Sequence, residues 1–206
     1  MAEFDVARFG PRERAQFLTA LVAPRPIAFV STVSGTGVGN LSPFSFFMAA
    51  GYNPLSVAFS PVRLRTGAEK DSVRNVRETG EFVVNIATHA MLAKLNQASF
   101  DYPPDVDEFD AAGFTRAPST VVKPPRVAEA AASLECRLFR IVPHGTGPSS
   151  GTYIIGEVVH IHVSDEVLTA GIPDNRKIEH VARLGADAYA RIAPELLFDL
   201  KRPAAP

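Results

Sequence analysis

The sequence has no cysteine pair, no strong net charge and no long apolar segment, so it is typical of an ordinary globular protein. Its 206 residues include one cysteine, Cys136, so no internal disulfide can form. The 21 basic and 22 acidic residues leave a net charge of −1, which argues against a dedicated nucleic-acid or membrane-surface protein. No apolar run approaches the roughly 20 residues that a membrane helix needs, and the acidic N-terminus has no apolar signal segment. We therefore expect a cytoplasmic protein that binds neither nucleic acid nor membrane.

Common catalytic signatures are also missing. The chain has no Gly-x-Ser-x-Gly, His-Glu-x-x-His, Cys-x-x-Cys or phosphate-binding Gly-x-x-x-x-Gly-Lys sequence. Residues 34–39 are glycine-rich but lie between two expected strands, so we interpret them as a hairpin turn rather than a dinucleotide-binding motif. His160 and His162 would share one face of a strand. Because no third ligand is evident near them, we expect no metal site. We interpret Cys136 as a buried strand residue.

The alternation of apolar and polar residues predicts mainly β-structure with a few helices. The expected strands are 27–33, 40–43, 55–60, 81–87, 130–143 and 152–164, and the expected helices are 12–22, 70–79 and about 89–97. Residues 44–52 are ambiguous, 101–126 are mostly loop with a short helical piece, and the last segment is expected to hold short helices. Strands joined mostly by turns favour an antiparallel barrel or sandwich with peripheral helices over a Rossmann fold.

Two segments indicate a ligand site, although each also has a purely structural interpretation. The 70–79 helix would have Asp71 or Ser72 as its N-cap and would end at Gly80. Lys70 and the Ser72 hydroxyl at its N-terminus, with Arg65 nearby, suit a phosphate monoester, but an ordinary capped helix would look the same. Residues 40–47 alternate small polar and aromatic side chains, which suits a flat heteroaromatic ligand or, alternatively, an aromatic core beside a turn.

The order of the motifs is more specific than any one of them. PRPIAFVST (24–32), NLSPFSFF (40–47), KDS (70–72) and GEFVVN (80–85) follow one another along the chain. LEC (134–136), GEVVH (156–160) and RLG (183–185) with Tyr189 extend the series. The series resembles the flavin reductase-like family of FMN-binding, flavoredoxin-like split-barrel proteins. The resemblance covers about residues 20–192 of one domain, 1–206.

The resemblance implies a fold, an assembly and a binding site. The fold would be an antiparallel, mainly β split barrel with peripheral helices, and two copies would form a homodimer with FMN near the subunit interface. Many relatives have Thr where this chain has Ser72, which keeps the hydroxyl. The implied residues are Ser31 and Thr32 beside the flavin; Asn40, Ser42, Ser45 and Phe46 along its ring and ribityl chain; Arg65, Lys70 and Ser72 at its phosphate; and Arg183 and Tyr189, from this or the partner subunit, closing the pocket.

The implied activity is that of an NAD(P)H-dependent flavin reductase. NADH or NADPH would give hydride to the flavin, and a partner monooxygenase or another acceptor would receive the electrons. Since the flavin carries the chemistry, no protein side chain is expected to be catalytic. Two alternatives stay open. The chain could be a non-catalytic FMN electron-transfer protein reduced by a partner, or a module for another aromatic phosphate or haem, with His89, His144 and His180 as possible axial ligands.

Overall fold

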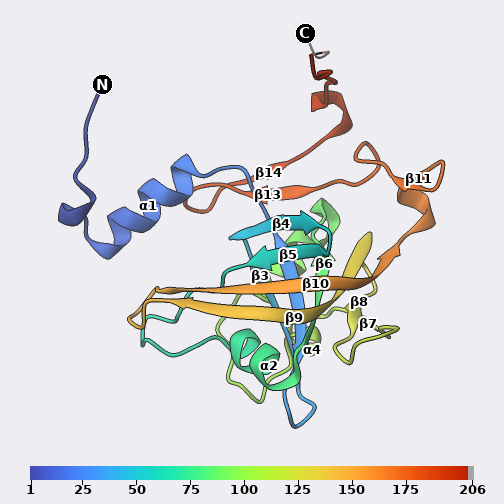
Figure 1. The fold of residues 1–206 in the computed structure, drawn as a ribbon, viewed down its shortest axis with the longest axis horizontal. Helices are drawn as coiled ribbons and strands as arrows, with labels where there is room; N and C mark the ends of the chain where they lie inside the picture. Colours follow the sequence, from blue (N-terminus) through green and yellow to red (C-terminus); the bar gives the residue numbers. More distant parts are fainter. Residues whose placement is uncertain (204–206) are drawn as a thin grey trace.

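The computed structural model describes residues 1–203 and centres on one seven-stranded antiparallel sheet (Figure 1). Each pair of neighbouring strands in this sheet runs antiparallel. The predicted class, mainly antiparallel β-structure with peripheral helices, is confirmed. In spatial order the strands are β3 (Gly39–Phe44), β2 (Ala28–Val33), β6 (Glu81–Ile86), β9 (Ala132–His144), β10 (Gly151–Val163), β5 (Leu55–Phe59) and β4 (Phe47–Tyr52).

The two edge strands of the sheet are neighbours in the sequence. β3 ends at Phe44 and β4 begins at Phe47, so only Ser45 and Phe46 separate them. A link of two residues spans only about 10 Å between strand ends, so the sheet must curl until its edges approach each other. The result is an incompletely closed barrel. The segment 44–52, ambiguous in the sequence, supplies this second edge.

Helices lie around the barrel and match the sequence expectation in part. Both longer helices were predicted, and the segment near 89–97 is a 3-10 turn followed by a short α-helix. No helix within residues 1–203 is long and apolar enough to cross a membrane. The helices are α1 (Pro11–Leu21), α2 (Asp71–Thr79), α3 (Leu92–Gln97) and α4 (Glu108–Ala112), and the 3-10 turns are η1 (Val6–Arg8), η2 (His89–Met91), η3 (Asp165–Val167) and η4 (Pro194–Leu196).

The expectation of short helices in the last segment is confirmed only for two three-residue 3-10 turns. Beyond residue 164 the chain forms two small hairpins and two single 3-10 turns. One hairpin, β13 (Val181–Arg183) with β14 (Tyr189–Arg191), joins β1 (Arg25–Pro26) in a three-stranded sheet. Strands this short are stabilised by a partner more than 150 residues away, so local periodicity does not reveal them. The remaining strands are β7 (Arg116–Ala117), β8 (Arg126–Val127), β11 (Leu168–Thr169) and β12 (Ile172–Pro173).

Strands β2 and β6 at the centre of the sheet are buried on both faces, which explains their apolar runs. Phe29 packs with Leu41 and Phe109 on one face, whereas Val30 packs with Phe82 on the other. Cys136 is fully buried in the second cluster. Burial raises the pKa of its thiol, which keeps it protonated and unreactive. Its interpretation as a structural strand residue is confirmed.

Gly156 is expected to be a sensitive position in the core. It lies where the β9–β10 pairing shifts register, and a Cβ atom there would overlap Cζ of the fully buried Phe82. Gly156→Ala should therefore lower the free energy of unfolding by about 1–3 kcal/mol, measured by urea denaturation. Gly147→Ala is the matched control, because a Cβ on that loop glycine meets no atom within 4 Å. Equal stability of the two variants would contradict this account.

Candidate functional site

A cleft of about 250 Å³ opens at the N-terminus of α2. β3 contributes Asn40 and Ser42, α2 and the residue before it contribute Lys70 and Ser72, and α4 contributes Glu108. Both helices pack on β3, on the side of the molecule where Figure 1 shows them together. The loop 100–104 closes the remaining side with two aromatic rings in edge-on contact. The two candidate motifs of the sequence therefore meet in one place.

The first turn of α2 faces this cleft without a side-chain cap. The helix begins at Asp71 with Lys70 as its N-cap, and no side chain within residues 1–203 caps it. The prediction of Asp71 or Ser72 as N-cap is wrong, because both side chains have other partners. Asp71 pairs with Arg74 at 2.7 Å, and the Ser72 hydroxyl accepts a hydrogen bond from Nδ2 of Asn40 at 3.0 Å. The free N–H groups of the helix start can therefore bind an anion that enters the cleft.

Charged groups of both signs line the cleft. Nζ of Lys70 pairs with the carboxylate of Asp101, an exposed residue on the 100–104 loop. Glu69 is held away from Lys70 by Arg77 at 2.7 Å and by Arg63 at 3.1 Å. An anion that enters the cleft can therefore reach Lys70 by displacing Asp101, which is exposed to solvent.

Glu108 is the buried acid of the cleft. It is 6% exposed, and its Oε2 accepts the N–H of Leu41 at 3.0 Å. Burial raises the pKa of its carboxyl group to about 7, although the backbone hydrogen bonds from Leu41 and from Glu108 itself oppose the shift. Near neutral pH this site therefore holds a carboxyl group that exchanges a proton readily. No motif in the sequence singled Glu108 out.

Glu108 should make stability depend on pH in a definite direction. Its folded-state pKa of about 7 exceeds the roughly 4.3 of an unfolded Glu, so the folded protein binds more protons between these values and loses stability as pH rises through them. Glu108→Gln removes this loss and is expected to stabilise the protein at pH 8, relative to wild type, by about 1–2 kcal/mol. This is below the roughly 4 kcal/mol of the full shift, because the cleft is open to screening solvent.

Urea denaturation of wild type and Glu108→Gln at pH 8 and pH 4.5 measures this effect. Gln keeps an acceptor for the Leu41 N–H, so the two proteins should be nearly equally stable at the lower pH. A stability difference that is the same at both pH values would show that the carboxyl group is not titrating as described.

Ser45 and Phe46, which were predicted to line a ligand, are fixed by Arg25. This arginine is 5% exposed; its Nε lies 3.5 Å from Oγ of Ser45, and its Cζ lies 5.9 Å from the ring centre of Phe46. Its other nitrogens donate to the carbonyls of Thr19, Val22 and Leu184 at 2.5–2.8 Å. Burial, followed by the charge of Arg183, lowers its pKa. This role was not evident from the sequence, although Arg25 stands between two prolines in the PRP motif.

Arg183 and Tyr189 lie opposite each other in the β13–β14 hairpin. Cζ of Arg183 is 4.3 Å from the ring centre of Tyr189, and both line a second, open cleft with His89 and Asn96. This cleft shares no residue with the cleft at α2. β13 pairs with β1, which places Arg183 opposite Arg25 and so next to the corner that holds Ser45 and Phe46.

Three further predicted residues lie outside the cleft. Ser31 and Thr32 are fully buried, where the Ser31 hydroxyl donates to the carbonyl of Pro125 and the Thr32 hydroxyl accepts from Asn75 at 3.1 Å. Arg65 is exposed on the loop between β5 and α2. The cleft itself gathers four of the predicted residues: Asn40, Ser42, Lys70 and Ser72.

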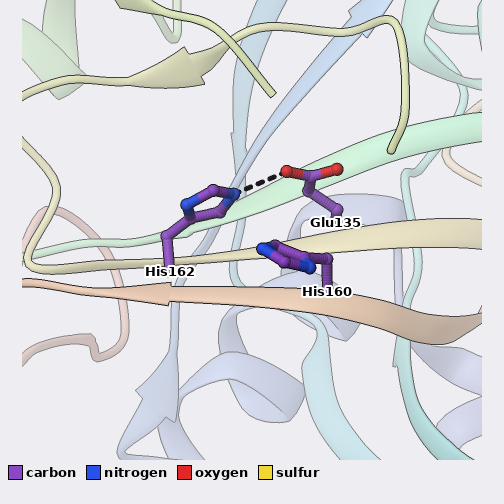
Figure 2. A group of neighbouring side chains, drawn as sticks. All are labelled: Glu135, His160 and His162. Atoms are coloured by element: carbon purple, nitrogen blue, oxygen red, sulfur yellow. Dashed lines mark hydrogen bonds and ion pairs between the residues drawn. The ribbon is translucent and has the colours of Figure 1, made fainter. Parts of the chain in front are cut away.

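The histidine pair of β10 has a neighbour that the sequence did not reveal. His160 and His162 do share a face, with ring centres 4.7 Å apart. The expectation that no third ligand lies near them is wrong, because Glu135 of β9 pairs in register with His160 (Figure 2). Which β9 residue lies opposite depends on the register of the hairpin, which the sequence does not fix.

Comparisons with known proteins agree on one relationship. A family model described as a flavin reductase like domain matches residues 21–182. An uncharacterised protein of Halalkalibacterium halodurans is 37% identical over 194 residues, 93% of this chain and 92% of that protein. The structure of nitrilotriacetate monooxygenase component B from Bacillus cereus superimposes with a TM-score of 0.91 at 32% identity, over 97% of this chain and 98% of that one. A split barrel domain from Shewanella frigidimarina superimposes over the whole of both chains with a TM-score of 0.81 at 25% identity.

Proposed function

Because the chain belongs to the flavin reductase-like family, with the split-barrel fold expected of it, we propose that it is an FMN-binding oxidoreductase that reduces flavin with NADH or NADPH. The observation that carries the proposal is the cleft at the N-terminus of α2. There a lysine, a serine hydroxyl and uncapped helix N–H groups converge beside polar side chains of β3. The domain would extend over residues 1–206, and the location would be cytoplasmic.

The cleft fits the phosphate group of FMN. A phosphate monoester carries a charge of about −1.5 to −2 near neutral pH and offers several strong acceptors. Lys70 supplies a cation, Ser72 a hydroxyl donor, and the start of α2 its free N–H groups and positive dipole end. Phosphate would compete with the exposed Asp101 for Lys70. It would also favour the protonated form of Glu108, which lines the same cleft.

Four of the predicted residues follow β3 from this cleft to the β3–β4 link: Asn40, Ser42, Ser45 and Phe46. Asn40 and Ser42 can bind the polar ribityl chain, and Ser45 with Phe46 can bind the ring system. Arg25 holds these last two in place through a buried guanidinium. A bound flavin would supply the redox chemistry by accepting hydride from reduced nicotinamide and passing electrons to an acceptor. The side chains that line the cleft and the β3–β4 link would bind and orient the flavin and keep water away from it.

A homodimer and an electron acceptor complete the proposal. The barrel exposes large apolar side chains on β4, β5, β9 and β10, the kind of surface that an obligate interface covers. A partner monooxygenase is a fitting acceptor, since the chain is similar to a monooxygenase component B.

The homodimer is tested by light scattering after gel filtration, which should give twice the mass of one chain. The exposed side chains are Met48, Tyr52, Leu55, Phe139, Val142, Tyr153, Val159 and Ile161.

The activity is tested with protein purified without added cofactor. We expect flavin absorption bands, either as isolated or after addition of FMN, and anaerobic oxidation of NADH or NADPH when FMN is present. Failure to bind flavin would reject the proposal as a whole. Bound flavin without oxidation of either nicotinamide would reject the reductase activity and leave a non-catalytic electron-transfer protein.

A further inference from the structure

The β9–β10 hairpin carries a cluster of metal-ligating side chains that shares no residue with the cleft at α2. Glu135, His160 and His162 each offer one ligand atom, and these atoms all lie within 4.8 Å of one another. Figure 2 shows both imidazole rings and the carboxylate on the same side of the hairpin. The proposed flavin chemistry uses none of the three.

The fold fixes Glu135 firmly in this cluster. Its side chain is fully buried, and its carboxylate accepts the N–H groups of Thr120, Val121 and Val122 at 2.7, 2.7 and 3.1 Å. Metal-ligating carboxylates are commonly held by such outer hydrogen bonds, which orient the oxygen toward the ion. The loop 118–125 thus positions the carboxylate, and Oε1, which accepts the Thr120 N–H, is also the oxygen that faces His162.

The histidines have nitrogen atoms available. Nε2 of His162 lies 2.6 Å from Oε1 of Glu135, so these two atoms share one proton. None of the side-chain hydrogen bonds found within residues 1–203 involves the ring of His160. An open cleft of about 430 Å³ reaches His162, with Ser133 and Ser164 in its lining. Arg126 also lines that cleft, but its Nε donates to the carbonyl of Pro118 at 3.1 Å.

We propose that Glu135, His160 and His162 form a binding site for a divalent transition-metal ion of the Zn²⁺ class. Imidazole nitrogen and carboxylate oxygen are ligands that suit Zn²⁺, with bonds of about 2.0–2.2 Å. Tetrahedral geometry with such bonds separates ligand atoms by roughly 3.3 Å, so the two rings need to move by about an ångström. The ion replaces the proton between His162 and Glu135, which passes to the other ring nitrogen or to water. Water from the open cleft supplies the fourth ligand.

A metal ion here would connect three parts of the chain. Glu135 belongs to β9, both histidines belong to β10, and the carboxylate already holds the loop 118–125. Binding would therefore raise the thermal stability of the folded protein. This consequence does not depend on whether flavin is bound or reduced.

The test uses the full chain, free of metal and of any affinity tag, titrated with Zn²⁺ against a chromophoric chelator. We expect one ion per chain with micromolar or tighter affinity. His160→Gln should weaken Zn²⁺ binding at least about tenfold. Loss of a residue that only hydrogen-bonds to a ligand already weakens metal binding by about this factor, and His160 would be a ligand itself. His144→Gln is the matched control, because that histidine lies at the far end of β9, and it should bind Zn²⁺ like wild type. Zn²⁺ should also raise the Tm of wild type and of His144→Gln, but not of His160→Gln.

Circular dichroism confirms that each variant is folded, and His162→Gln replaces His160→Gln if the latter does not fold. The proposal is overturned if wild type binds no Zn²⁺ at micromolar free metal. It is equally overturned if the folded His160 or His162 variant binds Zn²⁺ as tightly as wild type.

Discussion

Replacing both Lys70 and Ser72 with alanine is expected to weaken FMN binding about a hundredfold or more. The double variant removes the cation and the hydroxyl that face the uncapped start of α2. A hydrogen bond to a charged group contributes about 1.5–3 kcal/mol. Losing two such contacts therefore costs roughly 3 kcal/mol or more, which is a factor of at least about 100 in Kd. Quenching of flavin fluorescence during titration with protein measures the change.

Lys123→Ala is the charge-matched control, because Lys123 is exposed and lies outside the cleft. It should bind FMN like wild type. Wild-type affinity in the Lys70→Ala, Ser72→Ala variant would show that the phosphate binds elsewhere. The family assignment does not depend on this cleft. That result would therefore reject the proposed phosphate position but not the proposal that the protein binds flavin.

Glu135→Ala is expected to lower the free energy of unfolding by about 3–5 kcal/mol, the range for removing one partner of a buried charged pair. The substitution leaves three backbone N–H groups and Nε2 of His162 without their acceptor. Glu129→Ala is the matched control, since Glu129 also accepts a backbone N–H but its side chain is 31% exposed. That change should cost below about 1 kcal/mol. Urea denaturation at pH 7 compares the two.

The same carboxylate should contribute to stability in acid. Burial alone would raise its pKa, but the donors Thr120, His162, Val121 and Val122 together lower it to about 2. An unfolded Glu has a pKa of roughly 4.3, so this contribution is complete above that value and is lost as pH falls toward 2. The Glu135→Ala variant should not show this loss of stability as pH falls between these two values. A variant as stable as wild type at pH 7 would show that Glu135 does not hold the loop 118–125.

Local signals in the sequence were sufficient for every barrel strand except β4, whose segment was ambiguous, and for part of the site. The mostly apolar runs 27–33 and 81–87 are typical of strands buried on both faces, as β2 and β6 are. Gly80 ends α2 with a positive φ of 72°, as a helix-terminating glycine does. Asn40 and Ser72 came from separate motifs, and the fold brings them within 3.0 Å. The order of the motifs and their resemblance to one family grouped them, because each motif alone also had a structural interpretation.

What the sequence did not reveal depends on contacts between distant segments. β13 is a strand because β1 pairs with it, and Glu135 lies opposite His160 because the β9–β10 register shifts between Val158 and His160. The N-cap of α2 moved to Lys70 because Asn40 and Arg74 engage the side chains of Ser72 and Asp71. Each of these outcomes depends on a tertiary partner that competes with a local preference.

The two-residue link between β3 and β4 also determines where this architecture can accept added chain. An extra residue between Ser45 and Phe46 would turn the side chains of β4 to the opposite face and would pull on the buried Arg25. The exposed tip of the β9–β10 hairpin, residues 145–148, precedes the backbone hydrogen bonds that join Ser149 and Ser150 to Arg63, and it can accept extra residues. Added residues, in evolution or in the laboratory, are therefore expected to be tolerated at the hairpin tip. They are expected to disrupt the barrel at the corner that joins its two edges.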